Sequence, residues 1–214
     1  MSIERPPRLY VLAGVNGAGK SSIAGATFRA LGSDYFNPDE AARRLIAVNP
    51  ALSQKAANSA AWRQGVRLLR RAIEERLDFA FETTLGGNTI TQILAYAAAK
   101  GIEIHIWYVG LSNPELHLER VRARVRRGGH DIPETDIRRR YEHSRLNLIS
   151  LLPHLTALRV HDNSEEADPA AEKVPLPVLV LQMERSTILG PPDLSCTPDW
   201  AKPIVAAALK LSRS

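Results

Sequence analysis

Residues 14–21 read GVNGAGKS, the G-x-x-x-x-G-K-S pattern of a phosphate-binding loop. An apolar run at residues 9–13 precedes the loop, and a stretch compatible with a helix follows it at about residues 20–30. Glycines let the backbone wrap around phosphate groups with its N–H groups pointing inward, and the N-terminus of the next helix adds positive potential. A strand, this loop and a helix in that order predict a nucleoside-triphosphate site. The alternative is a chance glycine-rich turn, which would have to arise with the full motif in this context.

The polar residues of the loop have expected partners on ATP. Lys20 is expected to reach the β- and γ-phosphates, and the Ser21 hydroxyl to complete the ligand shell of Mg²⁺. ATP and Mg²⁺ are therefore the expected cofactors. The loop residues expected to contact ATP are Gly14, Asn16, Gly17, Ala18, Gly19, Lys20, Ser21 and Ser22.

Apolar runs bounded by turn residues alternate with helical patterns along the chain, which predicts an α/β P-loop NTPase fold with a parallel sheet flanked by helices. The expected strands are at residues 9–13, 34–37, 79–83, 102–109 and 155–160, with a strand or hairpin at 174–183. Helices are expected at residues 20–30, 53–77, 89–100 and 200–211, with Asn37 capping a helix that starts at Pro38 and Asn88 capping another. We expect a core domain at residues 1–166 and a C-terminal extension at residues 167–214.

An arginine-rich helix begins at Asn113 and Pro114 and ends at two glycines, and another helix follows as far as about residue 152. Two helices around a Gly-Gly-His loop predict a mobile lid over about residues 113–152. Arg120 and Arg124 lie four residues apart and so share one helical face. We expect both arginines to be catalytic and to stabilise the phosphoryl group during transfer.

Composition narrows the class of protein. The chain has 214 residues and a net charge of +5, but its basic helices also carry acidic residues and few aromatic ones, which does not favour nucleic acid as a partner. Cys196 is the single cysteine, so no internal disulfide is possible. No apolar stretch has the length of a signal peptide core or a membrane span. We therefore expect a cytoplasmic protein with no membrane partner.

Downstream motifs narrow the class further. No strand ends in Asp-Glu as in ABC-type ATPases, and no N-K-x-D guanine motif is present. The chain resembles the zeta toxin family of P-loop kinases from toxin–antitoxin systems. The resemblance covers about the first 165 residues and rests on GVNGAGKSS (14–22), FNPDEAAR (36–43), FETTLGG (81–87), RVRARVRRGGHDIPE (120–134), RRYEHSRLNL (139–148) and DNS (162–164). It implies transfer of the γ-phosphoryl group of ATP to a hydroxyl of a small-molecule acceptor, UDP-N-acetylglucosamine in characterised members. An antitoxin partner is compatible with it, although the sequence contains no antitoxin-like segment.

The resemblance also implies roles for individual residues. Asp39 becomes the general base, the alternative being a solvent-facing acid in a first helical turn. Glu82, Thr83 and Thr84 are expected to bind the acceptor, and Glu82 could instead hold water-bound Mg²⁺. The alternative for the threonines is a simple turn at a strand end.

Two further places in the chain leave alternatives open. The family's second lid arginine is replaced here by His130, so Arg139 or Arg140 takes its place, and Arg140 is an expected substrate contact. Asp162 and Asn163 are expected near the adenine, with a polar turn as the alternative. Two other functions compete with a small-molecule kinase, namely an ATP-binding regulatory protein and an RNA-end kinase.

Overall fold

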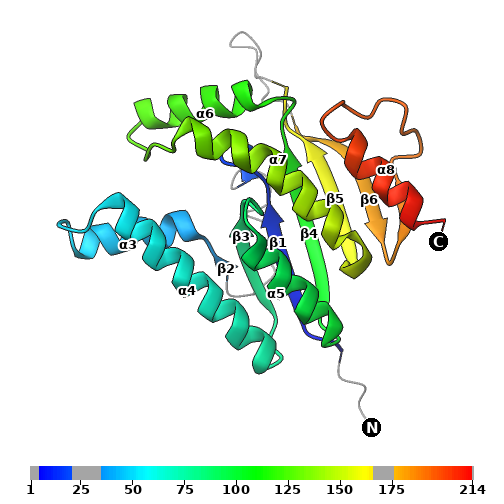
Figure 1. Ribbon diagram of the computed structural model, residues 1–214, viewed down its shortest axis with the longest axis horizontal. Coiled ribbons are helices and arrows are strands. Elements are labelled where there is room, and N and C mark those ends of the chain that lie inside the picture. The colour runs from blue at the N-terminus through cyan, green and yellow to red at the C-terminus, as the bar shows by residue number, and fades with distance from the viewer. Residues whose placement is uncertain (1–4, 21–34, 166–175, 214) are drawn as a thin grey trace.

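A seven-stranded sheet forms the centre of the protein (Figure 1). The computed structural model describes residues 5–20, 35–165 and 176–213. The strands lie in the order β2-β3-β1-β4-β5-β6-β7. Their bounds are β1 Arg8–Ala13, β2 Tyr35–Phe36, β3 Phe79–Thr83, β4 Glu103–Gly110, β5 Ala157–Asp162, β6 Val178–Glu184 and β7 Thr187–Gly190.

Five of these strands make the expected parallel sheet, and the last two extend it in the opposite sense. Strands β2, β3, β1, β4 and β5 pair in parallel. Strands β6 and β7 are antiparallel additions at the β5 edge, so the sheet is mixed. Strand β7 was not expected, because its hairpin turns through Arg185 and Ser186, both at positive φ, rather than through a glycine or asparagine pair.

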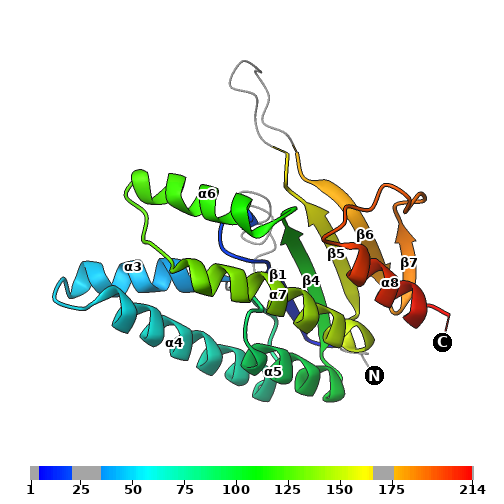
Figure 2. The same cartoon turned by 45° about the horizontal axis from the view of Figure 1, so that its top comes forward.

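Six described α-helices surround the sheet (Figure 2). They are α3 Pro38–Val48, α4 Gln54–Glu74, α5 Asn88–Ala99, α6 Pro114–Arg126, α7 Glu134–Leu151 and α8 Lys202–Leu211. None of them is both long and apolar enough to cross a membrane. The helix expected at residues 20–30 lies, except for Lys20, outside the described residues.

Side-chain caps set several helix starts. Asn37 accepts hydrogen bonds from the backbone N–H groups of Asp39 and Glu40, as expected. The prediction that Asn88 caps α5 is wrong. Gly87 occupies the cap position in an extended conformation, so that Asn88 is already the first helical residue and makes no capping bond.

Helices α5, α7 and α8 lie over the same face of the sheet (Figure 1). Leu94 of α5, Leu148 of α7 and Ile204 of α8 are completely buried in one apolar cluster with the side chains of the central strands. Burial of such large apolar side chains contributes roughly 1.5–3 kcal/mol each. The C-terminal half of the expected lid is therefore part of the core.

Candidate functional site

The phosphate-binding loop leaves the carboxyl end of β1, between β3 and β4. Its first N–H group, that of Gly14, donates to the Thr83 carbonyl oxygen at 3.2 Å. Gly14, Gly17 and Gly19 all have positive φ angles, which L side chains rarely adopt. A Cβ atom at residue 17 would also lie 2.8 Å from the His117 carbonyl oxygen. The glycines are thus required by the backbone path and by the close approach of α6.

Lys20 is directed into the loop. Its Nζ donates to the carbonyl oxygens of Gly14 at 2.7 Å and Val15 at 3.3 Å, and lies 3.4 Å from a carboxylate oxygen of Glu82. The other carboxylate oxygen of Glu82 accepts from the Tyr35 hydroxyl and from Asn37 Nδ2, both at 2.9 Å. Burial and the adjacent charge of Glu82 raise the pKa of Tyr35, which stays a neutral donor. Glu82 therefore connects β2, β3 and the loop.

A cavity of about 230 Å³ lies against the loop, and we call it the loop cavity. Arg120 and Arg124 line it from α6, so the shared face of these two arginines is turned toward Lys20. Arg120 also donates to the Glu165 carbonyl oxygen at 3.3 Å, and Arg124 to that of His130 at 3.2 Å. The residues that line the loop cavity are Asn16, Gly17, Gly19, Lys20, Glu82, Arg120 and Arg124.

Asp39, the predicted base, lies in the first turn of α3 and faces the lid. One carboxylate oxygen lies 3.7 Å from Arg124 Nη1 and the other 3.9 Å from His130 Nε2. Burial lowers the pKa of His130, which favours the neutral imidazole at that contact. The neighbouring Glu40 instead pairs with Arg44 at 3.8 Å on the outer side of the helix. Of the two adjacent acids, only Asp39 meets the predicted site.

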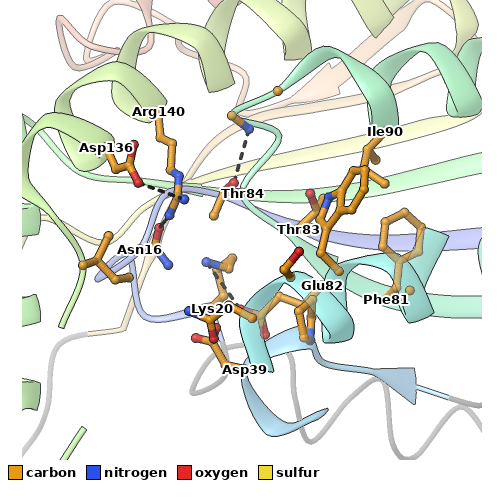
Figure 3. Close-up of a pocket in the computed structure, with 18 of the residues that line it drawn as sticks. Asn16, Lys20, Asp39, Phe81, Glu82, Thr83, Thr84, Ile90, Asp136 and Arg140 are labelled. Carbon is orange, nitrogen blue, oxygen red and sulfur yellow. Dashed lines mark hydrogen bonds and ion pairs between the residues drawn. The ribbon is translucent and has the colours of Figure 1, made fainter. Parts of the chain in front are cut away.

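A second cavity, of about 420 Å³, extends from Lys20 and Glu82 toward α4 and α5 (Figure 3). We call it the α4–α5 cavity. It shares Asn16, Lys20 and Glu82 with the loop cavity, so the two cavities adjoin at these residues. The polar end also holds Asp39, His130, Asp136 and Arg140, and the apolar end holds Phe36, Trp62, Val66, Phe81 and Ile90.

Sequence reasoning missed the aromatic wall of this cavity. Trp62 projects from α4 with 48% of its surface exposed, while Phe36 comes from β2. Gly65 lets α4 pack on the Phe36 ring, because a Cβ there would lie 2.7 Å from it. The sequence signal was Trp62 itself, the one aromatic residue of α4.

Thr83 and Thr84, two of the expected substrate contacts, lie at the end of β3. Thr83 Oγ1 accepts from the backbone N–H of Leu85 at 3.1 Å, and Thr84 Oγ1 from that of Gly86 at 3.3 Å. Both threonines therefore make the strand-end turn that was their alternative, and both still line the α4–α5 cavity.

Arg140 lies between Asn16 and Asp136 in Figure 3. It donates to Asn16 Oδ1 at 2.7 Å, and its other Nη lies 3.6 Å from Asp136. Burial lowers the pKa of Arg140, but the adjacent Asp136 opposes that shift. Arg139 instead pairs with Asp136 at 2.8 Å with most of its side chain exposed. Of the two arginines left open by the sequence, Arg140 is the one at the site.

Asp162 ends β5, and Asn163 follows it beside the phosphate-binding loop. Asn163 Nδ2 donates to the Ala18 carbonyl oxygen at 2.9 Å, and Asp162 accepts from the indole N–H of Trp200 at 3.2 Å. These contacts fix the polar turn against the loop. The roles predicted for Ser21 and Ser22, including metal binding by Ser21, fall outside the described residues.

A resident magnesium ion would need oxygen ligands near the phosphates. Within the described ranges, no three of His, Cys, Asp and Glu form a cluster able to hold a metal ion. Glu82 supplies one carboxylate that lines the loop cavity, and P-loop proteins complete the magnesium shell with a loop hydroxyl and the nucleotide. Of the described residues, Glu82 fits the carboxylate part of this arrangement.

The fold and loop define a P-loop protein of the kinase-like class, a fold that supports a phosphotransferase. Residues 2–168 match the zeta toxin family, and the chain belongs to that family. An uncharacterized protein of Haemophilus influenzae is 35% identical over 132 residues, which are 60% of this chain and 88% of that protein.

Solved structures share the fold at low sequence identity. A chain of the AvrRxo1-ORF1:ORF2 complex, solved with ATP, superposes with a TM-score of 0.67 at 15% identity and covers 97% of this chain. This chain spans 65% of the length of that one. The PezAT chromosomal toxin–antitoxin system of Streptococcus pneumoniae contains a chain with a TM-score of 0.56 at 15% identity, covering 76% of this chain and 70% of that one.

Proposed function

We propose that this protein is an ATP-dependent kinase that transfers the γ-phosphoryl group to a hydroxyl of a small molecule, with a nucleotide sugar such as UDP-N-acetylglucosamine as the acceptor. The observation that carries the proposal is the junction of the two cavities at Lys20 and Glu82. Phosphoryl transfer requires donor and acceptor in line, with positive charge around the group that moves. The loop cavity would hold the phosphates of ATP, and the α4–α5 cavity would hold the acceptor.

The residues would divide the work as follows. Lys20, Arg120 and Arg124 would neutralise charge on the phosphates from two sides. Asp39 would accept the proton of the acceptor hydroxyl, and its place at the lining of the α4–α5 cavity supports this role. When bound, Mg²⁺ would supply charge neutralisation between the phosphates, held by Ser21 and Glu82.

The shape of the α4–α5 cavity supports the acceptor class. Its polar end offers Thr83, Thr84 and Arg140 to hydroxyl and phosphate groups, whereas its far end offers Trp62 and Phe36 to a planar ring. A nucleotide sugar combines these parts. Because the PezAT neighbour comes from a toxin–antitoxin system, the proposal includes an antitoxin as a partner. It also includes a cytoplasmic location.

The test is an ADP-release assay with Mg-ATP and, separately, UDP-N-acetylglucosamine, other UDP-sugars, free sugars and short RNA oligonucleotides. Release stimulated by a UDP-sugar, with a phosphorylated product seen by mass spectrometry, is the expected result. Stimulation by 5′-hydroxyl RNA alone would identify an RNA-end kinase instead. ATP binding with no turnover on any acceptor would favour a regulatory protein.

A further inference from the structure

His117 of α6 has no role in the catalysis proposed above, yet it is 1% exposed and lies against the phosphate-binding loop. Its Nδ1 lies 2.8 Å from the backbone carbonyl oxygen of Asn16. Burial lowers the pKa of this imidazole to about 4, so the ring is neutral near pH 7. Because a carbonyl oxygen only accepts hydrogen bonds, Nδ1 carries the ring proton and donates it.

This bond sets the direction of the next N–H group in the loop. Among the described residues, the one cis peptide joins Gly190 to Pro191, so the peptide between Asn16 and Gly17 is trans. In a planar trans peptide the C=O and the following N–H point in opposite directions. With the Asn16 carbonyl turned toward His117, the Gly17 N–H points away from α6. Gly17 lines the loop cavity, whereas His117 lines neither cavity of the described site.

Neighbouring side chains fix the position of the His117 ring relative to the peptide between Asn16 and Gly17. The His117 ring meets Tyr141 of α7 edge to face, with ring centroids 5.7 Å apart. A Cβ at residue 17 would lie 2.8 Å from the His117 carbonyl oxygen and 3.4 Å from Val121 Cγ2, so glycine lets α6 come close enough for the bond. Asn16 is held on its other side by Arg140 at 2.7 Å. Both helices of the expected lid thus hold one loop residue.

We propose that His117 is a positioning residue that fixes the peptide between Asn16 and Gly17 so that the Gly17 N–H donates to a phosphate oxygen of the bound nucleotide. With the peptide turned over, the Asn16 carbonyl would face that oxygen and two acceptors would repel each other. The inference rests on the proposed function only in requiring that the loop bind ATP.

Two substitutions separate the hydrogen bond from the packing. His117→Leu fills most of the same volume but removes the hydrogen-bond donor. We expect it to raise the Kd for Mg-ATP about tenfold, the effect of losing one buried hydrogen bond. His117→Asn places an amide N–H where Nδ1 stands, so it should bind Mg-ATP within about threefold of wild type, although the lost ring packing lowers its melting temperature. Val121→Ala is the matched control, because it trims the same interface without touching the donor.

Isothermal titration with Mg-ATP and thermal melts of all four proteins give the answer. The expected result is that the variants that keep the hydrogen-bond donor, His117→Asn and Val121→Ala, retain their affinity for Mg-ATP whatever their melting temperatures, whereas His117→Leu loses it. Affinity that falls in step with melting temperature, or wild-type affinity in the leucine variant, would overturn the role. If the leucine variant does not fold, His117→Asn and Val121→Ala decide: ATP affinity near wild type in the asparagine variant at a lowered melting temperature supports the role, and a loss of affinity as large as its loss of stability overturns it. A wild type that binds no nucleotide would refute the proposed function itself.

Discussion

The loop cavity and the α4–α5 cavity adjoin at Lys20 and Glu82, yet they are built from different parts of the chain. On the side of the phosphate-binding loop, the loop cavity takes its shape from backbone, with glycines at positive φ and main-chain carbonyl oxygens around Lys20. The α4–α5 cavity is made by side chains from separate elements, among them Phe36 and Trp62. A site formed by backbone needs one short motif, whereas a site formed by side chains is set by how distant elements pack. We therefore expect substitutions at the two cavities to affect different steps.

The largest expected effect comes from the loop side. Lys20→Ala should lower ATP turnover about 10⁴-fold, because among the described residues Lys20 is the one lysine that lines the loop cavity. The fold should persist, since Glu82 keeps its bonds from Tyr35 and Asn37. Turnover is measured by ADP release, and circular dichroism checks the fold. Lys100→Ala, at the end of α5, serves as the control. Turnover near that of wild type in Lys20→Ala would exclude the kinase function.

Asp39, which lines the α4–α5 cavity, tests whether acceptor phosphorylation can be lost without loss of ATP binding. Asp39→Asn should lower acceptor phosphorylation about 10³-fold and leave ATP affinity within about twofold, because the amide fills the same space but cannot take the proton. Product formation and calorimetric ATP binding are the two measurements. Glu40→Gln, one residue along and paired with Arg44, should behave as wild type. Parallel loss of ATP binding in Asp39→Asn would make Asp39 a structural or metal-binding residue.

Arg124 tests the lid contribution to the loop cavity. Arg124→Ala should lower kcat on the order of 10²- to 10³-fold with a smaller change in ATP affinity, because its charge is used mainly as the phosphoryl group moves. Arg124→Lys should recover part of the rate, since an ammonium lacks the guanidinium fork. Arg122→Ala is the control, because Arg122 is exposed and pairs with Glu134 at 3.5 Å. Equal rates in the two alanine variants would move the role to Arg140.

The smallest expected effect belongs to the α4–α5 cavity. Trp62→Ala should raise the acceptor KM about tenfold while kcat and the KM for ATP stay unchanged, because a stacked ring contributes to binding and not to transfer. Tyr96→Ala removes an exposed aromatic ring of α5 that does not line this cavity, and it is the matched control. A change in ATP binding in Trp62→Ala would show that the two cavities do not act separately.

The sequence predicts the features that depend on a short local motif and misses those that depend on how distant elements pack. The loop, the five parallel strands, the helix cap at Asn37 and the helix start at Pro114 depend on local patterns, and the structure contains them. Strand β7 was missed because its turn has no distinctive residue pair. The Gly87 cap was missed because Asn88, a more favoured capping residue, follows it directly.

The site shows the same limit at the level of single side chains. Lys20 and Arg124 were expected near each other because motif and helical periodicity place them. Other contacts connect residues far apart in the chain, namely the hydrogen bonds of Glu82 with Tyr35 and Asn37 and the bond from His117 to Asn16. Trp62 likewise lines a cavity together with residues of distant elements. Nothing in a single sequence indicates which distant residues will meet, because that depends on the packing of the whole sheet and its helices.

Trp200, in the C-terminal part of the chain, packs against the ends of β4 and β5 beside the phosphate-binding loop. Its indole packs on Gly110, where any Cβ would collide with it, and it donates to Asp162. The family match ends at residue 168, before Trp200 and before the two strands that continue the sheet from β5 (Figure 1). A gene trimmed to the shared region would therefore express a protein with a bare, aggregation-prone edge. A tail exchanged between two relatives would therefore have to keep this contact with the end of β5, which lies beside the phosphate-binding loop.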